Sequence, residues 1–527
     1  MPTGTPIPGS AARRASAAGA AAGSGTRQGE AQGEACTLRS GRLGTAGLLF
    51  TVLAATAPLM VVAGVMPATF EVIGVVGQPL LFVLLGVVLA LFSFGYAELS
   101  RHVHNAGAFY AYISRGLGGT AGSGAALVAL VAYSALQTGV YGIFGYEARG
   151  LLGSYLDIQV AWWVPALAAV GVVGLLGWLR VDFNARVLGA LLLVEVALVA
   201  VFDLSAVLHP GAEGLSLHAL DPSTLTGAGV GTALCFCIAA FLGFEQAPVY
   251  AEETRHSQTT VVRAMFLAVG CVAIFFAVSS WALTVAAGPS RIVPAARRQS
   301  AGLLFLLTRS GLGGTFTDVL HLLFVTGIFA SMLSFHNVVA RYAFAMGRER
   351  LLPRVFARTG RSSGAPVTGS LLQSAVSAAV VGAFAVTDHG PIGDPTAPVA
   401  HLFTWMANVG ALGVMLLMAV ACLAVIVFFV RRGAGRAQFW RLAASATAGA
   451  ALLLIACFTV RDFHLLIGCH AGSSLTWVLP GIIALAAVVG LVQGAVLRRV
   501  RPAVHHRIGL SNQAFQLERV TEVVGEI

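Results

Sequence analysis

Lysine is absent from this chain of 527 residues, and all 32 of its basic residues are arginines. The absence excludes lysine chemistry, including a Schiff base. Charged residues of either sign are also scarce, at 10% of the chain, whereas 57% of the residues are hydrophobic and the mean hydropathy is +0.84. A soluble protein of this size could not bury so much apolar surface, so the composition indicates a membrane protein.

Cysteine is sparse, and its spacing suits neither a metal site nor a disulfide framework. The seven cysteines are Cys36, Cys235, Cys237, Cys271, Cys422, Cys457 and Cys469. They form no CxxC pair, and most lie in apolar stretches, where free cysteine behaves as a small hydrophobe. The chain also lacks HExxH, a plausible GxSxG site and acidic metal clusters, so we expect no cofactor, no metal and no enzyme.

Long apolar runs, in contrast, are abundant, and each predicts a membrane-spanning helix of roughly 20 residues. We predict about twelve spans, at 45–67, 79–98, 120–144, 161–179, 186–207, 228–250, 263–287, 316–340, 367–386, 401–430, 438–459 and 475–497. Because irregular backbone cannot face lipid, the expected fold is an all-α integral membrane bundle.

The arginines cluster on one side of the predicted spans. Alternate loops and the two terminal segments hold 26 of them, and the opposite loops hold 6. Positive residues favour cytoplasmic loops, so both termini are predicted to be cytoplasmic and the protein to lie in the cell membrane. Topology thus explains the net charge of +10 without nucleic acid as a partner.

Two predicted spans carry breaks at mid-membrane depth. The first contains Pro58, which removes an amide hydrogen and clashes with the preceding turn, and the sixth contains Gly243, Glu245 and Pro248. Breaks five spans apart are those that an inverted five-helix repeat would place in equivalent positions. A packing kink is the alternative reading of either break.

Composition and the two breaks together predict how the chain is divided into tails, a membrane domain and repeats. The predicted parts are a disordered cytoplasmic tail (1–42), a twelve-helix membrane domain (43–500) and a cytoplasmic C-terminal tail (501–527). Within the membrane domain, the predicted repeats cover about 44–207 and 228–430, followed by two helices at about 438–497. Residues 288–315 form a long external loop with four arginines, which can fold over the external mouth.

An interrupted helix would expose unpaired backbone groups. The half-helix that begins at Pro58 offers the amides of Leu59, Met60 and Val61 to an anion, aided by the positive dipole end. In the sixth span, carbonyls near the break would face a cation, and an anion site beside a cation site fits an α-amino acid zwitterion. The carbonyls are those of Ala239, Ala240 and Leu242. The predicted binding residues are therefore Thr56, Ala57, Leu59, Met60, Ala239, Ala240, Leu242 and Gly243.

Three stretches of the chain resemble the amino acid–polyamine–organocation permeases, which have the leucine-transporter fold. FSFGYAELSRHVHNAGAFYAYISRGLG (92–118) resembles their second-to-third helix region, and FLGFEQAPVYAEET (241–254) is similar to their sixth helix. NVVARYAFAMGRERLLPRVFA (337–357) resembles the end of the eighth helix and the loop after it. With the span pattern, the resemblance covers about residues 44–498.

The resemblance implies uptake or exchange of a small molecule, driven by a proton or ion gradient. The expected substrate is an amino acid, with a polyamine or another organic amine as the alternative. The family's first-helix break usually carries a glycine-rich turn, and here Thr56, Ala57 and Pro58 stand in its place. A channel is disfavoured because the chain has no filter-like repeat.

Two intramembrane carboxylates are candidate coupling or gating groups, because a charge inside the bilayer is costly. Glu195 lies in the fifth span, where the resemblance implies that several proton-coupled relatives carry a lysine. It is expected to carry a proton, with a protonated structural role as the alternative. Glu245 follows the sixth-span break and is expected to bind the substrate's amine, gate or relay a proton, or else to cap the half-helix that starts near Pro248.

Other polar residues are candidates for the same site. Ser331 and Ser334 in the eighth span are expected to offer hydroxyls to sodium or to Glu195, with helix packing as the alternative. Gln137 and Tyr141, one turn apart in the third span, are candidate cavity-lining residues.

Overall fold

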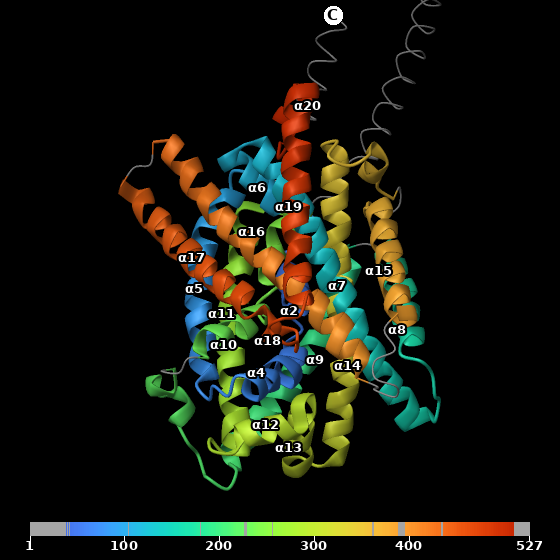
Figure 1. Ribbon diagram of the computed structural model, residues 1–527, viewed down its shortest axis with the longest axis vertical. Helices are drawn as coiled ribbons and strands as arrows, with labels where there is room; N and C mark the ends of the chain where they lie inside the picture. The colour runs from blue at the N-terminus through green and yellow to red at the C-terminus, as the bar shows by residue number, and fades with distance from the viewer. Residues whose placement is uncertain are drawn as a thin grey trace, which may run out of the picture.

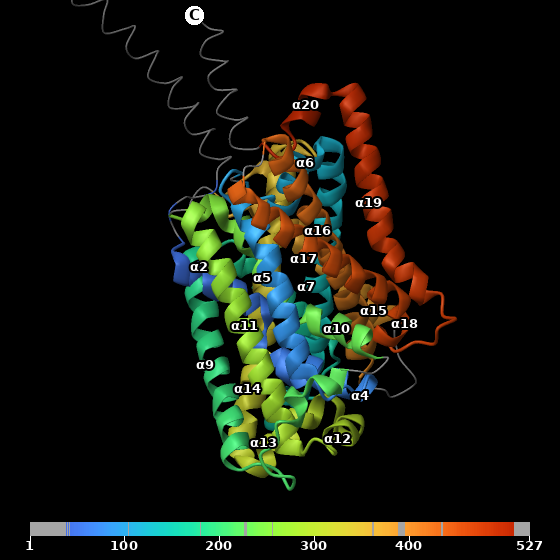
Figure 2. The same ribbon diagram turned by 90° about the vertical axis from the view of Figure 1, so that its left-hand side faces the viewer.

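The structure, a computed structural model, describes residues 38 and 41 and the ranges 43–103, 105–179, 181–225, 229–255, 257–360, 363–387, 396–433 and 436–510. Over these residues it is helical and contains no strand (Figures 1 and 2). Eleven of its helices are long and apolar enough to cross a membrane, by length and composition. The predicted all-helical membrane fold is therefore confirmed, for eleven of the twelve predicted spans.

The long helices follow the predicted order. They are α2 (Thr45–Thr56) with α3 (Pro58–Met60), η1 (Val61–Val65) and α4 (Met66–Val72); α5 (Gln78–Ser100); α7 (Gly119–Leu156); α9 (Val181–Leu208); α10 (Val230–Ala239) with η4 (Phe244–Glu253); α11 (Ser257–Ala287); α14 (Gly314–Arg348); α15 (Val367–Thr387); η7 (Pro398–Phe403) with α16 (Thr404–Arg431); α17 (Arg436–Arg461); and α19 (Leu475–Val500). The shorter helices include α6 (Ala108–Leu117), α8 (Trp163–Leu176), α12 (Ile292–Gln299), η5 (Ser300–Gly302), α13 (Leu303–Gly311), α18 (Phe463–Leu466) and α20 (Pro502–Arg507).

The first and last described segments lie at the same end of the bundle. The Leu43 amide donates to the Glu253 carbonyl (3.1 Å), and Glu252, its neighbour in η4, pairs with Arg348 at the end of α14. The Gly509 amide in turn donates to Glu349, directly after α14 (2.8 Å). This end, drawn at the top of Figure 1, is called the terminal end below, and the opposite end carries α12 and α13.

The fourth predicted span, 161–179, is the one not included among the eleven, because its helix in the structure is too short. Its helix α8 has 14 residues, a rise of about 21 Å, which is less than the roughly 30 Å of a hydrocarbon core. The chain nevertheless returns between α7 and α9. Helix α7 begins beside α20 at the terminal end, where Thr120 contacts His505 (3.1 Å), and Ala185 of α9 lies beside Gly47 at the start of α2.

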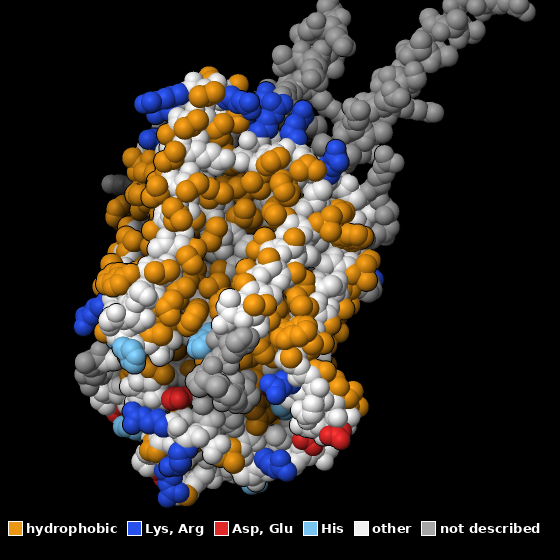
Figure 3. All heavy atoms as spheres, turned by 45° about the vertical axis from the view of Figure 1, so that its right-hand side comes forward, with side chains coloured by type: hydrophobic (Ala, Val, Ile, Leu, Met, Phe, Trp, Pro, Cys, Tyr) orange, Lys and Arg blue, Asp and Glu red, His pale blue; other side chains and the backbone are white. Residues whose placement is uncertain are grey.

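Small residues let these helices pack closely, as is typical of membrane bundles. A Cβ atom on Gly490 of α19 would lie 2.6 Å from the carbonyl of Ser123 in α7. A Cβ on Gly116 of α6 would lie 2.2 Å from the Ala424 carbonyl of α16. These contacts hold α6, α16 and α19 around α7. Apolar side chains cover the middle of the outer face shown in Figure 3, and arginines lie toward its two ends.

The long loop predicted at 288–315 folds against the first span. Its helices α12 and α13 pack on α4, and a small apolar cluster of Phe70, Ile292, Ala296 and Leu303 joins them. Most of the predicted N-terminal tail (1–42) lies outside the described residues. The predicted C-terminal tail is described only to residue 510, and it forms α20 at its start.

Candidate functional site

The first span is interrupted at Ala57. This residue has left-handed backbone angles (φ 43°, ψ 69°), and its amide donates to the Ala54 carbonyl (3.2 Å), which ends α2. The left-handed conformation costs a non-glycine residue roughly 1–2 kcal/mol. Pro58 then begins α3, because its ring presets the helical φ and its missing N–H is not needed in a first turn. The break predicted from Pro58 is therefore present.

The sixth span is interrupted over residues 240–243, between α10 and η4. Gly243 adopts φ 129°, a conformation that side chains disfavour. A Cβ atom there would lie 2.8 Å from the Cβ of Ala55 and 3.0 Å from the amide nitrogen of Thr56. The two breaks thus touch each other, and only glycine fits at the contact.

The turns use some of the backbone groups that the sequence predicted to be free. The Val61 amide donates to the Ala57 carbonyl (3.2 Å), and the Leu242 amide donates to the Ala239 carbonyl (3.3 Å). The Val61 amide, predicted to be free, is therefore already paired, whereas the Ala239 carbonyl accepts one bond and keeps a second lone pair. The amides of Leu59 and Met60 remain, because a helix's first turn has no acceptor four residues earlier.

A cavity of about 280 Å³ lies beside the two breaks. Its wall combines Ala55, Thr56, Met60, Val61, Gly64, Val65 and Ala68 of the first span with Leu136, Val140 and Ile143 of α7, Phe236 and Ala239 of α10, Leu242, Ser300 and Ala301, Phe335 of α14, Val399 and Phe403 of η7, Thr404, Ala407 and Asn408 of α16, and Leu466. The wall has no ionisable side chain, so the site can hold a ligand with a neutral, mostly apolar body. Ser300 and Ala301 bring η5, from the loop at the α12–α13 end, to this wall.

The predicted binding residues divide into three groups. Thr56, Met60, Ala239 and Leu242 line the cavity. Ala57, Leu59, Ala240 and Gly243 lie in or beside the breaks without forming its wall. Gln137 and Tyr141 do not line it either: the Gln137 amide contacts Tyr141 Oη (3.2 Å) and His336 Nδ1 (3.2 Å) inside the α7–α14 interface.

Several cavity residues were not predicted. Phe236 and Phe335 offered no signal, since an aromatic residue in an apolar span is ordinary. Asn408 is a single carboxamide in an apolar run, which could have marked it. Its amide donates to the carbonyls of Thr404 (2.8 Å) and Leu466 (3.2 Å), which leaves the carboxamide oxygen as its remaining polar atom.

Glu245 is fully buried and joins the sixth-span break to α7. One carboxylate oxygen accepts the amide of Gly243 (2.8 Å), and the other accepts Tyr133 Oη (2.8 Å). The carboxylate therefore caps the turn before η4, at an amide five residues before Pro248, and not the half-helix predicted to start near Pro248. Its side chain is not part of the cavity wall.

Glu195 lies inside the bundle, 2% exposed, on the face of α9 toward α14. A Cβ atom on Gly327 would lie 2.4 Å from its carboxylate, so glycine makes room for it. Ser331 and Ser334 do not serve Glu195. Their hydroxyls donate to the carbonyls of Ala55 (3.1 Å) and Thr51 (3.0 Å), and so fasten α14 to the broken first span.

Asp203, two helical turns beyond Glu195 in α9, is a second buried carboxylate that the sequence reasoning missed. It is 7% exposed and accepts the hydroxyl of Ser279 in α11 (2.7 Å). An acidic residue in the apolar run VFDLSAVL was a visible signal.

Two buried ion pairs close the terminal end of the bundle. Arg341 donates to both carboxylate oxygens of Glu253 (2.5 and 3.1 Å), and Arg348 donates to both of Glu252 (3.0 and 2.5 Å). Both pairs join α14 to η4, directly after the sixth-span break. Sequence reasoning missed the pairing, because its members are separated by 88 and 96 residues.

Comparison with known proteins agrees with this architecture. The family model described as Amino acid permease matches residues 48–489, which is most of the chain and includes both helix breaks and the cavity. No curated protein sequence matches the chain. The chain therefore belongs to the amino acid permease family and is a multi-pass membrane transporter rather than an enzyme.

Proposed function

We propose that this protein carries a neutral amino acid with an apolar side chain across the cytoplasmic membrane by alternating access. The observation that carries the proposal is the direct contact of two interrupted helices beside an apolar cavity. The family supplies amino acid transport, and the cavity supplies the class of amino acid.

The two breaks suit the ends of a zwitterion. The amides of Leu59 and Met60, at the positive end of a half-helix, would bind the carboxylate. The carbonyls of Ala240 and Leu242, in the break that follows α10, would accept the ammonium group. Thr56, which lines the cavity, already donates its hydroxyl to the Leu53 carbonyl (2.7 Å), so recognition rests mainly on backbone.

The cavity wall disfavours charged substrates. A polyamine or a cationic amino acid would need an acidic partner for its second charge, because an unpaired charge is costly in a dry site. The nearby carboxylate of Glu245 is already used by Gly243 and Tyr133. Phe236, Phe335 and Phe403 offer apolar surface instead.

The terminal end is the cytoplasmic end in this proposal. The supporting observation is the excess of arginine on the predicted cytoplasmic side. With its ion pairs formed, that end is closed, and the cavity reaches η5 at the opposite, external end. In this proposal the interrupted spans are equivalent members of an inverted repeat, at about 44–207 and 228–430; the contact between their breaks supports this arrangement.

Proton coupling through Glu195 is the finer part of the proposal. An ionised carboxylate inside the bundle is unfavourable without a partner, so opening to water on one side would favour release of its proton. Sodium is the alternative coupling ion. Sodium is disfavoured because the Ser331 and Ser334 hydroxyls donate directly to carbonyls of α2. A sodium ion bound between α14 and α2 would have to replace these hydrogen bonds.

Counterflow in proteoliposomes tests the substrate class. Vesicles loaded with unlabelled leucine or phenylalanine should accumulate the labelled amino acid, whereas glutamate, arginine or putrescine should not support exchange. A thermal-shift series with the same compounds should rank them alike, because a ligand stabilises the state that it binds. Exchange of putrescine or arginine without exchange of leucine would overturn the proposed specificity. Ionic current without counterflow would overturn carrier function.

A further inference from the structure

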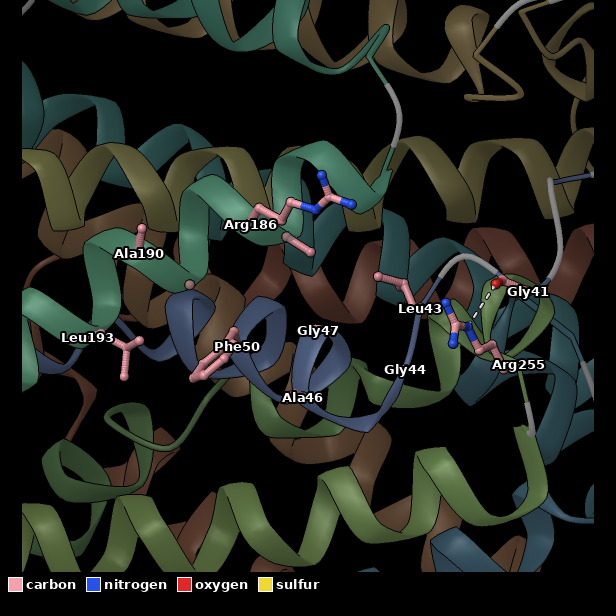
Figure 4. A pocket seen from close by; sticks show the side chains of 12 residues that line it. Gly41, Leu43, Gly44, Ala46, Gly47, Phe50, Arg186, Ala190, Leu193 and Arg255 are labelled. Carbon is pink, nitrogen blue, oxygen red and sulfur yellow. Dashed lines mark hydrogen bonds between the residues drawn. The ribbon is translucent and has the colours of Figure 1, made fainter.

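A second cavity, of about 530 Å³, lies on the outside of the bundle between α2 and α9 (Figure 4). Its lining residues are Gly41, Leu43, Gly44, Ala46, Gly47, Phe50, Ala185, Arg186, Gly189, Ala190, Leu193 and Arg255. We name it the α2–α9 groove. It belongs to neither the helix breaks nor the substrate cavity.

The groove exists because small residues form its floor. A Cβ atom on Gly189 would lie 3.0 Å from the ring of Phe50, and one on Gly47 would lie 4.0 Å from the Cβ of Ala185. These close contacts bring α2 and α9 together, and much of the trough is lined by glycine and alanine, which have no large side chain to fill it. The trough faces outward, since Ala46, Ala190 and Leu193 are exposed.

The groove has an apolar end and a basic end. Figure 4 shows Leu193 and Phe50 at one end and Arg255 with Gly41 at the other, with Arg186 between them. Candidate spans begin at Thr45 and Ala185 and lie on both sides of Arg255, ending at Glu253 and resuming at Gln258. The basic end therefore lies at the membrane interface, and the apolar end lies one to two helical turns deeper.

Both arginines keep donors free for a ligand. Within the described part of the chain, neither Arg186 nor Arg255 belongs to an ion pair, and the groove wall contains no carboxylate. Arg255 donates only its Nε to the Gly41 carbonyl (3.3 Å), which holds the guanidinium at the groove. An arginine fork matches a phosphate group in geometry as well as charge.

We propose that the α2–α9 groove binds an anionic glycerophospholipid. Arg186 and Arg255 hold its phosphate at the interface, and an acyl chain follows the trough past Gly47 and Phe50 toward Leu193. Two cations without an acidic neighbour in the wall favour a lipid of net negative charge over a zwitterionic one. The lipid would bridge the broken first span to α9, the helix that carries Glu195.

The direct test is lipid-dependent stability of the purified full-length protein in detergent. Phosphatidylglycerol should raise the melting temperature in a saturable way, whereas phosphatidylcholine with the same acyl chains should not. The double variant Arg186→Gln/Arg255→Gln should bind phosphatidylglycerol at least about tenfold more weakly. Arg499→Gln, an exposed arginine at the same end of the bundle, is the matched control and should behave as wild type.

Water-soluble anions and a trough-filling variant distinguish a bound lipid from a bound free anion. Inorganic phosphate and glycerol 3-phosphate should not reproduce the stabilisation; if either does at equal concentration, the site binds a free anion and the lipid proposal fails. Ala190→Phe fills the trough and keeps both arginines, so it should weaken phosphatidylglycerol binding; wild-type binding in this variant would exclude the acyl position.

Asp182 stands four residues before Arg186 in the sequence. Asp182→Asn removes one negative charge close to Arg186 in the sequence and should leave lipid binding unchanged or stronger, whereas weaker binding would contradict the charge argument. Equal stabilisation by the two lipids, or full binding by the double arginine variant, would overturn the proposal.

Discussion

The two halves of the bundle on either side of the helix breaks are built differently. Toward the terminal end, two bidentate ion pairs join α14 to η4, and a cluster of fully buried tyrosines packs around them. Toward the α12–α13 end, α14 borders a cavity of about 280 Å³ with mostly apolar walls. One half is closed by charge and hydrogen bonding, and the other is hollow.

The closed half also contains buried polar groups whose burial costs free energy. Within the described residues, the hydroxyls of Tyr96 and Tyr250 are buried without a hydrogen-bond partner. Buried polar groups without partners are unfavourable. In the alternating access proposed above, opening of the terminal end would return these hydroxyls to water, which offsets part of the cost of breaking the ion pairs.

The largest expected effect comes from breaking the closed half. Arg341→Met leaves Glu253 buried and unpaired, so the free energy of unfolding in detergent should fall by about 3–5 kcal/mol. The double variant Arg341→Met/Glu253→Met should recover most of this loss. Arg101→Gln, which breaks the exposed pair with Glu98, should cost no more than about 1 kcal/mol. Equal costs for the buried and the exposed pair would remove the contrast between the two halves.

Filling the hollow half should have the next largest effect. Ala239→Phe places a ring in the cavity beside the breaks, and accommodating it costs about 1–3 kcal/mol, which is up to about 100-fold in substrate affinity. Thermal-shift titration with leucine measures the loss. Ala495→Phe, on an exposed face of α19, is the control and should bind normally. Wild-type affinity in Ala239→Phe would move the substrate to another site.

A substitution of Glu195 tests whether proton coupling depends on α9 rather than on either of the two halves. Glu195→Gln keeps the shape but fixes a neutral side chain, so uptake driven by a pH gradient should fail while exchange at equal pH continues. One coupled proton supports about tenfold accumulation per pH unit, equal to about 1.4 kcal/mol, and the variant should lose this gain.

The matched control for coupling is Asp203→Asn, which removes the other buried carboxylate of the same helix. It should retain accumulation. If Asp203→Asn loses accumulation and Glu195→Gln does not, the coupling group is Asp203. Sodium dependence of the wild-type protein would instead favour an ion site near Ser331 and Ser334.

The smallest expected effect concerns residues 501–510, which include α20 and pack against the terminal end of the bundle. Glu349, after α14, accepts the Gly509 amide and the Asn105 amide (2.8 Å each). Burial raises the pKa of Glu349 from 4.5 to about 7, against opposing contributions from Gly509, Asn105 and Arg348. The protonated form is therefore favoured in the folded protein relative to the unfolded chain, and this stabilisation is complete below pH 4.5 and is lost as the pH rises through about 7.

Limited trypsin digestion measures the effect. Cleavage at Arg507 should be faster at about pH 8 than at about pH 6 in the wild type, relative to Glu349→Gln at the same pH. Because glutamine does not titrate, the variant corrects for the protease's own pH dependence. A wild-type to variant ratio that does not change with pH would show that Glu349 does not control docking of this segment.

The positions of the breaks could be predicted, but most side-chain partners could not. Pro58 and Gly243 mark the breaks in the sequence because proline and glycine change the allowed backbone conformation at their own positions. Ser331 and Ser334 were placed on the correct helix, yet their hydroxyls bond to α2 carbonyls rather than to Glu195. Glu245 lies beside a break, as predicted, but its carboxylate accepts the Gly243 amide rather than capping a half-helix that starts near Pro248.

The third span shows the limit most clearly. Gln137 and Tyr141 were chosen as polar residues one turn apart, whereas Leu136 and Val140, each one position earlier, line the cavity. Successive residues of a helix point about 100° apart, so the face that meets the cavity depends on how the helix is rotated in the bundle.

The sequence by itself determined membrane residence, the order of the spans, the two breaks and the family, because hydropathy, proline, glycine and motif order are local properties of the chain. Only the tertiary structure decided that the cavity beside the breaks is mostly apolar, that Arg341 and Arg348 pair with Glu253 and Glu252, and that a groove opens between α2 and α9. Each of these depends on how helices far apart in sequence are rotated and packed, which no local pattern specifies.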